Sequence, residues 1–235
     1  DSIRPYFVEC SDGNKISCLF IKRNKNPFYT ILYSHGNASD IGQLFLFIQD
    51  LAIIINCDFV IYDYSGFGSS TGASSEKNII QNIEDIFNFL TNSLKLNERT
   101  IILYGQSIGS VPTLNLATKT NIAGVILQSP IASGLRVIFP NLVTTLFFDV
   151  FKNSETIKKV TVPVLIIHGL DDTIVPLQHA YNLYDNVPNK VEPLWMAGVE
   201  HGDVECSPDF IPRLKRFINH DLKQIFIPQS VSPLD

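Results

Sequence analysis

The sequence predicts an α/β fold with a mostly parallel sheet of eight strands and helices on both faces. Short runs rich in Ile, Val and Leu alternate with longer amphipathic segments along most of the chain. This alternation is typical of parallel strands that are buried on both sides. The chain opens with two strand-like segments joined by Ser11-Asp12-Gly13-Asn14, a turn sequence that predicts an antiparallel N-terminal hairpin.

The hairpin is followed by a strand and a helix. Residues 4–10 and 16–22 form the expected hairpin, and residues 28–34 form a buried strand after a polar loop. Ser39 or Asp40 can cap a helix that runs to about residue 56, because its apolar side chains recur at helical spacing.

A second pair of elements repeats this order. Residues 57–64 form the next strand, and a loop rich in glycine separates it from a helix over residues 75–96. Ile79, Ile83 and Ile86 recur at helical spacing and are expected on the buried face of that helix.

The second half of the chain continues the pattern. Strands are expected over residues 100–105, 124–128, 164–168 and 192–197, and helices over residues 108–119, 177–186 and 208–220. We expect one domain over residues 1–220, with a short lid inserted at residues 131–162, and a C-terminal tail over residues 221–235.

Composition excludes several classes of protein. The chain has 235 residues, of which 45% are hydrophobic and 17% charged, and its formal net charge is −5. The apolar content argues against disorder, and the acidic charge argues against a nucleic-acid partner. Polar residues such as Asp50 and Asn56 interrupt its most apolar stretch, residues 44–62, so no segment predicts a membrane-spanning helix.

The four cysteines show no metal-binding spacing. Cys10 and Cys18 are expected to face each other on adjoining strands, so a disulfide between them stays open. Buried reduced thiols in a cytosolic protein are the favoured interpretation for these two, and for Cys57 and Cys206.

The most informative motif is a serine flanked by glycines between a strand and a helix. It reads Gly105-Gln106-Ser107-Ile108-Gly109. A GxSxG sequence in this context predicts a nucleophile elbow, a sharp turn that presents the serine hydroxyl above the edge of the sheet. The motif alone is common by chance, so its position between strand and helix carries the prediction.

A nucleophilic serine needs a base that takes its proton. His168 is expected within a strand and His179 within a helix, whereas His201 lies in the loop between the last strand and the last helix. A loop histidine can reach back to the serine, so we predict His201 as the base.

The base in turn needs an acid that orients it. Asp171 and Asp172 both follow the strand that ends at His168, and the length of the turn favours Asp172. Asp203 is too close to His201 in sequence to orient it easily, and we interpret it as a neighbour that tunes the loop.

The developing oxyanion needs backbone N–H donors. The amide of Ile108 is one candidate, and the amide of Asn37 is the other, because Gly36 lets the preceding loop approach closely. His35 is a possible second base, but a buried histidine that fixes this loop is the favoured interpretation. The glycine loop after Asp63 lacks a phosphate-binding spacing and is expected to shape the wall of the site.

These motifs resemble the α/β-hydrolase superfamily, and more narrowly the alpha/beta hydrolase domain-containing protein 17 family. The resemblance runs from about residue 7 to residue 218 and is carried by residues 34–38, 63–68, 105–112, 129–140, 163–169 and 191–195. It implies an α/β-hydrolase fold and a triad of Ser107, Asp172 and His201.

The resemblance also implies a function and a location. Members of that family remove palmitate from protein cysteines as membrane-associated serine thioesterases, and an N-terminal cysteine cluster holds them on membranes. This sequence carries no such cluster. We expect a cytoplasmic protein, and two alternatives stay open: a segment that precedes residue 1 anchors it at the cytosolic face of membranes, or the protein is soluble.

An apolar run over residues 141–151 lies where such folds insert lids. One hypothesis is that it lines an acyl-chain groove or touches lipid, and the other is that it packs on the core. The candidate groove residues are Leu135, Phe139, Leu146 and Phe147.

The sequence therefore predicts a serine hydrolase that cleaves ester or thioester bonds through an acyl-enzyme, without a metal or cofactor. A protein depalmitoylase acting on an acylated protein is favoured. A small-molecule carboxylesterase or lipase is the alternative, and a non-catalytic binding module on the same fold is the rival from another class.

Overall fold

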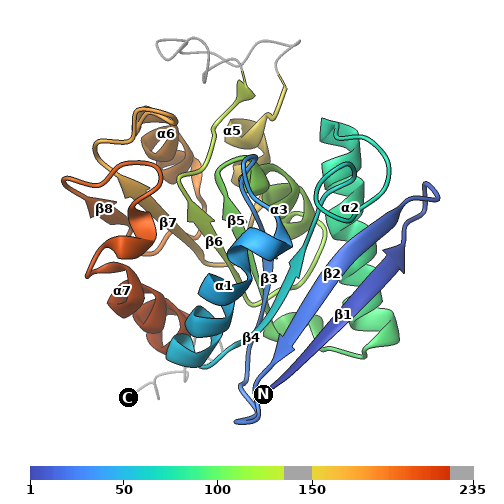
Figure 1. Cartoon of the computed structure of the whole chain (residues 1–235). Coiled ribbons are helices and arrows are strands. Elements are labelled where there is room, and N and C mark those ends of the chain that lie inside the picture. The colour runs from blue at the N-terminus through green and yellow to red at the C-terminus, as the bar shows by residue number, and fades with distance from the viewer. Residues whose placement is uncertain (135–149, 223–235) are drawn as a thin grey trace, which may run out of the picture.

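A computed structural model describes residues 1–134 and 150–222. Within these residues, eight strands form one sheet in the order β1-β2-β4-β3-β5-β6-β7-β8 (Figure 1). The strands are β1 (Ser2–Glu9), β2 (Lys15–Lys22), β3 (Thr30–Ser34), β4 (Asp58–Tyr62), β5 (Ile101–Gln106), β6 (Gly124–Gln128), β7 (Val164–Gly169) and β8 (Leu194–Met196). The β1–β2 and β2–β4 pairs are antiparallel and all later pairs are parallel, which confirms the predicted fold class.

Helices cover both faces of the sheet. They are α1 (Ile41–Ile55), α2 (Glu76–Asn88), α3 (Ser110–Ala117), α5 (Asn153–Thr156), α6 (Gln178–Asn186) and α7 (Phe210–Arg216). The buried side chains of α2, α3 and α6 belong to the apolar cluster on one face, whereas those of α1 and α7 belong to the cluster on the other face (Figure 1).

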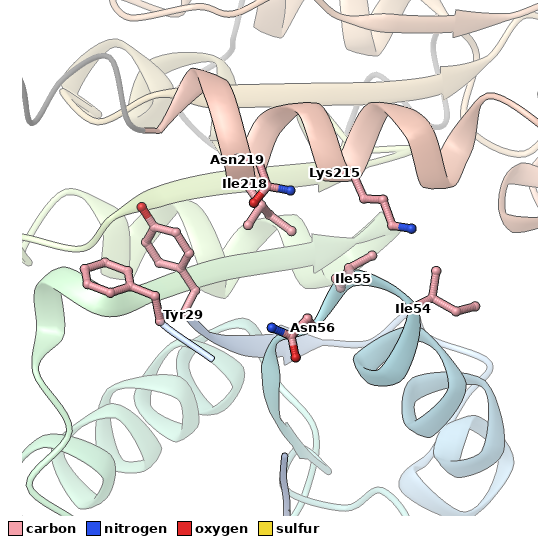
Figure 2. A pocket seen from close by; sticks show the side chains of 8 residues that line it. Tyr29, Ile54, Ile55, Asn56, Lys215, Ile218 and Asn219 are labelled. Atoms are coloured by element: carbon pink, nitrogen blue, oxygen red, sulfur yellow. The ribbon is translucent and has the colours of Figure 1, made fainter. Parts of the chain in front are cut away.

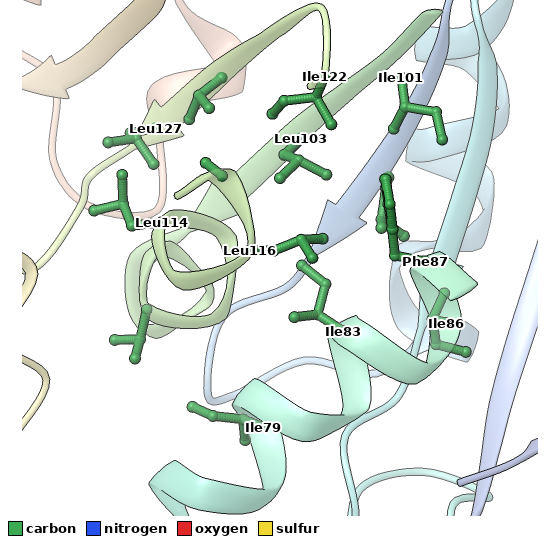
Figure 3. Packing of buried hydrophobic residues seen from close by; sticks show 14 of the residues in the cluster. Ile79, Ile83, Ile86, Phe87, Ile101, Leu103, Leu114, Leu116, Ile122 and Leu127 are labelled. Carbon is green, nitrogen blue, oxygen red and sulfur yellow. The ribbon is translucent and has the colours of Figure 1, made fainter. Parts of the chain in front are cut away.

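The strands contribute alternate residues to the two clusters. Ile101 and Leu103 of β5 face α2 and α3, as Figure 3 shows. Ile102 and Tyr104 of the same strand face the opposite way, toward the cluster that contains α1 and α7. A parallel strand that is buried on both faces must be apolar at nearly every position, which explains why β5 has no polar residue before Gly105.

The register aligns the carboxyl ends of the central strands. Ser34 pairs with Gly105, and Gln106 pairs with Gln128. The loops that follow β3, β5, β6 and β7 therefore leave the same edge of the sheet. In open α/β sheets this edge is where ligands bind.

Several helix boundaries differ from the expected ones. The helix expected over residues 75–96 ends as α2 at Asn88 and is followed by a wide turn over Phe89–Ser93. The helix expected over residues 108–119 begins with a 3₁₀ turn over Ser107–Gly109 before α3. The last helix continues through a wide turn over Phe217–Asp221, and Leu222 is buried in the core. The chain thus stays packed on the domain slightly beyond residue 220.

The expected domain and lid boundaries stay predictions. Of the lid, residues 135–149 lie outside the described residues, as do residues 223–235 of the expected tail. Within the described part of the chain, no helix is both long and apolar enough to cross a lipid bilayer.

The expectation that Cys10 and Cys18 face each other is wrong. In the hairpin register Cys18 pairs with Tyr6, and the amide of Cys10 donates to the carbonyl of Asn14. All four cysteines are free thiols. Cys10, Cys18 and Cys57 are buried as expected, whereas Cys206 is exposed, so the expectation of burial is wrong for Cys206. Burial, helped by the nearby Asp63 carboxylate, raises the pKa of Cys18 to about 12, so this thiol stays protonated at neutral pH.

Candidate active site

Ser107 occupies a sharp turn between β5 and α3. Its φ of +53° lies in the left-handed region, which costs energy for a residue with a side chain and is typical of functional turns. The Ser107 side chain is neither fully buried nor fully exposed. The structure therefore places Ser107 in the conformation expected of a nucleophile elbow.

The two glycines around Ser107 are required by close packing. A Cβ on Gly105 would lie 2.6 Å from the carbonyl oxygen of Gly109 and 2.7 Å from Oγ1 of Thr113. A Cβ on Gly109 would overlap the carbonyl oxygen of Ser34. A side chain at either position would therefore force the turn to move from the observed geometry.

A buried serine ties the turn to neighbouring segments. The hydroxyl of Ser110 donates to the carbonyl of Ser107 at 2.6 Å. Its oxygen also accepts hydrogen bonds from the amide of Ile131 at 3.3 Å and from Nδ2 of Asn153 at 3.1 Å. The sequence analysis assigned no role to Ser110 or Asn153, because these contacts join segments that are distant in sequence.

Asp172 and His201 form a hydrogen-bonded pair. Nδ1 of His201 lies 2.7 Å from Oδ2 of Asp172. The Asp172 carboxylate is fully buried, whereas the His201 side chain is 20% exposed. The amides of Ile174 and Val175 donate to Oδ1 of Asp172 at 2.9 and 2.7 Å, so the orientation of the carboxylate is fixed.

The environment of Asp172 favours its ionised form. Burial alone would raise the pKa of this carboxyl. The hydrogen bonds from His201 and from the amide of Val175 outweigh burial and hold the pKa below its usual value. Asp172 is therefore a carboxylate at neutral pH and can stabilise a positive charge on His201.

A second histidine, His168, also contacts Asp172. Its Nε2 atom lies 2.8 Å from the carbonyl oxygen of Val175 and 3.3 Å from Oδ2 of Asp172. Burial lowers the pKa of His168, despite opposing contributions from the Val175 carbonyl and Asp172. His168 is thus a neutral ring that donates through Nε2 and supports the acid loop.

The loop after β3 lies against the nucleophile turn. A Cβ on Gly36 would lie 3.8 Å from Cβ of Ser107, so the backbone of this loop passes beside the serine. Asn37 follows directly and is exposed. The assignment of the Asn37 and Ile108 amides as oxyanion donors stays a prediction.

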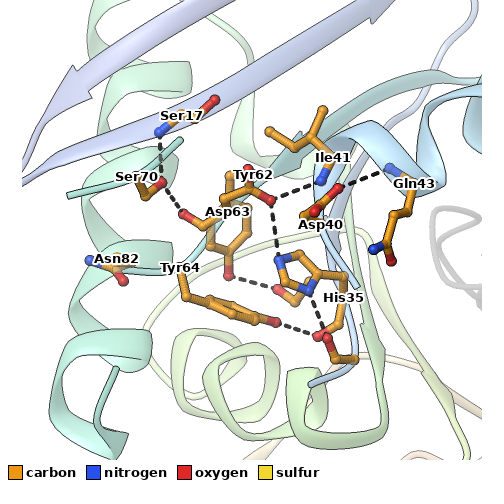
Figure 4. A network of polar contacts seen from close by, with 12 residues as sticks. Ser17, His35, Asp40, Ile41, Gln43, Tyr62, Asp63, Tyr64, Ser70 and Asn82 are labelled. Carbon is orange, nitrogen blue, oxygen red and sulfur yellow. Dashed lines mark hydrogen bonds and ion pairs between the residues drawn. The ribbon is translucent and has the colours of Figure 1, made fainter. Parts of the chain in front are cut away.

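His35 fixes this loop through the network of polar contacts that Figure 4 shows. The ring is fully buried, and its Nδ1 atom lies 2.8 Å from the carbonyl oxygen of Gly36. Nε2 lies 3.5 Å from Oδ1 of Asp63, and the hydroxyl of Tyr64 donates to the His35 carbonyl at 2.7 Å. These contacts support the interpretation of His35 as a buried histidine that fixes the loop.

The glycine loop after Asp63 is built around the Asp63 carboxylate. The amide of Ile41, at the start of α1, donates to Oδ1 of Asp63 at 2.9 Å. Gly68 has a φ of +47°, and a Cβ there would overlap Oδ2 of Asp63. The loop therefore packs against its own strand end, which fits the expected role as a wall of the site.

The remaining predicted residues are Asp171, Asp203 and the four candidate groove residues. Asp171 is exposed and the buried Asp172 holds His201 instead. Asp203 is also exposed, so a role in tuning the loop stays a prediction. Leu135, Phe139, Leu146 and Phe147, the candidate groove residues, lie outside the described residues.

A separate groove opens at the opposite edge of the sheet (Figure 2). It has a volume of about 440 Å³ and is lined by Phe28, Tyr29, Ile54, Ile55, Asn56, Lys215, Ile218 and Asn219. Tyr29 and Asn56 precede β3 and β4, so the groove lies at the amino ends of the parallel strands. It is remote from Ser107, which follows the carboxyl end of β5.

Among the described residues, no group of three or more His, Cys, Asp and Glu side chains is placed to hold a metal ion.

Comparison with known proteins identifies the family. The family model described as "Serine aminopeptidase, S33" matches residues 25–154, more than half of the chain. Alpha/beta hydrolase domain-containing protein 17C of Mus musculus is 43% identical over 222 residues, which cover 94% of this chain and 69% of the mouse protein. The chain belongs to the alpha/beta hydrolase domain-containing protein 17 family. A second member, protein 17B of Homo sapiens, is also 43% identical, over 94% of this chain and 77% of its own length.

Solved structures show the same fold as this family member. An esterase of Pyrococcus furiosus has a TM-score of 0.75 at 16% identity, covering 92% of this chain and 91% of the esterase. The protein Est1E of Butyrivibrio proteoclasticus, solved with ferulic acid bound, has a TM-score of 0.73 at 18% identity, and the match covers 94% of this chain and 100% of Est1E. The chain is thus an α/β hydrolase by both family and fold.

Proposed function

We propose that this α/β hydrolase is a serine esterase or thioesterase that uses Ser107, His201 and Asp172 as its catalytic triad. The observation that carries the proposal is the hydrogen bond between Nδ1 of His201 and the buried Asp172 carboxylate. A carboxylate can only accept, so the Nδ1 atom carries the proton and the Nε2 lone pair is free to act as a base. The elbow conformation of Ser107 supplies the nucleophile at the same edge of the sheet.

The reaction proceeds through two acyl transfers. The Ser107 oxygen attacks the acyl carbon while Nε2 of His201 takes the hydroxyl proton, and the amides of Asn37 and Ile108 donate to the oxyanion. His201 then protonates the departing thiol or alcohol, which leaves an acyl-enzyme. A water molecule, deprotonated by His201, releases the carboxylic acid and restores Ser107.

The proposed substrate is a long-chain acyl thioester on a protein cysteine. Membership of the family supports this choice, because the motifs of the chain resemble those of protein depalmitoylases. On the same grounds we propose that the enzyme acts in the cytoplasm, at the cytosolic face of membranes. A carboxylesterase acting on small molecules is the second candidate, since the structural relative from Pyrococcus furiosus is named as an esterase.

Labelling with a fluorescent fluorophosphonate tests the catalytic proposal. The wild-type protein is expected to form an adduct at Ser107, and Ser107→Ala is expected to form none. A folded wild-type protein without an adduct would contradict catalysis and favour a binding module.

Substrate choice needs a separate comparison. A peptide carrying a palmitoyl thioester should be hydrolysed with a higher kcat/KM than a butyrate ester. The reverse order would favour a small-molecule esterase, and release of an amino acid from a peptide would favour an aminopeptidase.

A further inference from the structure

A polar network joins the segment after His201 to the strand end that carries Ser107. Glu205 lies in a short 3₁₀ turn over Val204–Cys206. Its Oε1 atom accepts hydrogen bonds from Nε2 of Gln128 at 2.5 Å and from Nε2 of Gln106 at 3.3 Å. Gln106 directly precedes Ser107 in sequence, so one hydrogen bond separates the histidine-bearing segment from the nucleophile turn.

The network continues into the core as two matching arms. The hydroxyl of Tyr33 donates to Oε1 of Gln106 at 3.0 Å, and the hydroxyl of Tyr104 donates to Oε1 of Gln128 at 2.5 Å. Gln106 and Gln128 are paired in register on β5 and β6. Each arm therefore runs from a tyrosine through a glutamine, and both arms end on one oxygen of Glu205.

The hydrogen-bond directions in the network follow from its chemistry. A carboxylate has no proton to give, so both glutamine NH₂ groups face Glu205 and both glutamine carbonyls face the tyrosines. Burial raises the pKa of Tyr33 and Tyr104, and the Glu205 charge adds to this effect. Both tyrosines thus stay neutral donors, and each hydrogen bond in the network pairs a donor with an acceptor.

The network adds a second attachment for the segment that carries His201, residues 199–206 (the His201 segment). On one side, the amide of Asp171 donates to the carbonyl of Val199 at 3.2 Å, and Asp172 holds the His201 ring. Those contacts join the segment to the loop after β7. Glu205 joins it to the ends of β5 and β6, and so sets its position relative to Ser107.

We propose that Glu205 is a positioning residue that holds the His201 segment at the working distance from Ser107, through Gln106 and Gln128. The proposal rests on the proposed serine hydrolase function. In this role Glu205 contacts Gln106 and Gln128, not the substrate or the reacting atoms. It acts as a shared hydrogen-bond acceptor between the two halves of the site.

The test compares Glu205→Leu with Glu205→Gln. Leucine keeps the approximate size but removes the acceptor, so both glutamine amides lose their partner. Glutamine keeps an acceptor oxygen and loses only the charge. Cys206→Ser is the matched control, because Cys206 lies on the same turn and its side chain is exposed.

Four quantities are measured for each variant. They are the rate constant for fluorophosphonate labelling of Ser107, kcat and KM for a short soluble ester, and the free energy of unfolding in urea. Glu205→Leu should lower the labelling rate and kcat by about tenfold to a hundredfold with little change in KM, because small displacements of catalytic groups are costly. Glu205→Gln should recover most of that loss, and Cys206→Ser should match the wild type.

A second variant separates positioning from general damage. Gln128→Leu removes one arm without touching Ser107 or His201, and its effect should be smaller than that of Glu205→Leu. The double variant should be no slower than Glu205→Leu alone, since both changes break the same network. If Glu205→Leu does not fold, Gln128→Leu and Glu205→Gln still test the acceptor.

Three results would overturn the proposal. They are a wild-type labelling rate in folded Glu205→Leu or in Gln128→Leu, equal losses in Glu205→Leu and Glu205→Gln, and purely additive losses in the double variant. A wild-type protein that does not label at all would instead refute the proposed function, so the two failures can be told apart.

Discussion

His201 and Asp172 are 29 positions apart in sequence and are joined by a hydrogen bond of 2.7 Å between Nδ1 and Oδ2. The other carboxylate oxygen is occupied by the amides of Ile174 and Val175. The carboxylate therefore cannot rotate without losing two hydrogen bonds. The imidazole is held in one orientation and in one tautomer, the one in which Nε2 is unprotonated.

Asp172→Asn should abolish most activity while leaving the fold intact. The new side chain can keep its oxygen on the amides of Ile174 and Val175, which turns its NH₂ group toward Nδ1 of His201. That contact selects the wrong tautomer, with the proton on Nε2, and His201 can no longer accept the proton of Ser107. We expect kcat to fall by about ten-thousandfold, as measured with a soluble ester.

Asp171→Asn is the matched control for this change. Asp171 is adjacent and exposed, so the same chemical substitution should leave kcat nearly unchanged. Loss of activity in Asp171→Asn together with an active Asp172→Asn would mean that the neighbouring carboxylate is the acid.

Gly109→Ala should destabilise the protein through the elbow. The added methyl group would overlap the carbonyl oxygen of Ser34, so the 3₁₀ turn must move away from β3. Overpacking of this kind costs about 1–3 kcal/mol, measured as the free energy of unfolding in urea. Gly202→Ala should cost less than about 0.5 kcal/mol, because a Cβ there meets nothing within 4 Å. Equal stabilities of the two variants would show that the elbow does not need this close approach.

Sequence patterns predicted the strands of this fold but not all of their ends. The strand expected over residues 192–197 is reduced to β8, Leu194–Met196. Pro193 has no backbone N–H and cannot donate to the sheet. The strand expected from residue 28 begins at Thr30, and Phe28 is 68% exposed. Both differences arise at strand ends, where an apolar residue does not by itself require burial.

The residues of the site also differ in whether local sequence or contacts distant in sequence determine them. Ser107, Asp172 and His201 were chosen because each follows a strand of the expected sheet and, for Ser107, because the GxSxG motif marks it; their catalytic roles stay a prediction. Glu205 could not be chosen in this way, since its partners Gln106 and Gln128 lie 99 and 77 positions away in sequence. His168 was placed within a strand by its apolar neighbours, and its contact with Asp172 depends on the turn between them.

Alanine substitution should slow labelling of Ser107 at His201, whereas at His35 it should mainly lower the free energy of unfolding. His201→Ala removes the proposed base and should slow labelling of Ser107 by more than about a thousandfold. His35→Ala leaves the Gly36 carbonyl without its partner and should lower the free energy of unfolding by about 1–3 kcal/mol. The folded fraction of His35→Ala should still label. Complete loss of labelling in folded His35→Ala, with labelling retained in His201→Ala, would make His35 the base.

His168 should make the stability of the protein depend on pH below about pH 6.5. Burial lowers the pKa of His168 from its usual value of 6.5. At pH values between the lowered pKa and 6.5, the unfolded chain therefore binds a proton that the folded protein does not. Stability must therefore fall as pH decreases through this range, by at most about 1.4 kcal/mol per pH unit for one proton.

His168→Gln removes the titrating ring and keeps a donor for the Val175 carbonyl. We expect a smaller slope of unfolding free energy against pH between pH 5 and 6.5, whatever the absolute stability. His220→Gln makes the same substitution at an exposed ring and is the matched control for the substitution itself. A slope in His168→Gln equal to that of the wild type would assign the pH dependence to other groups.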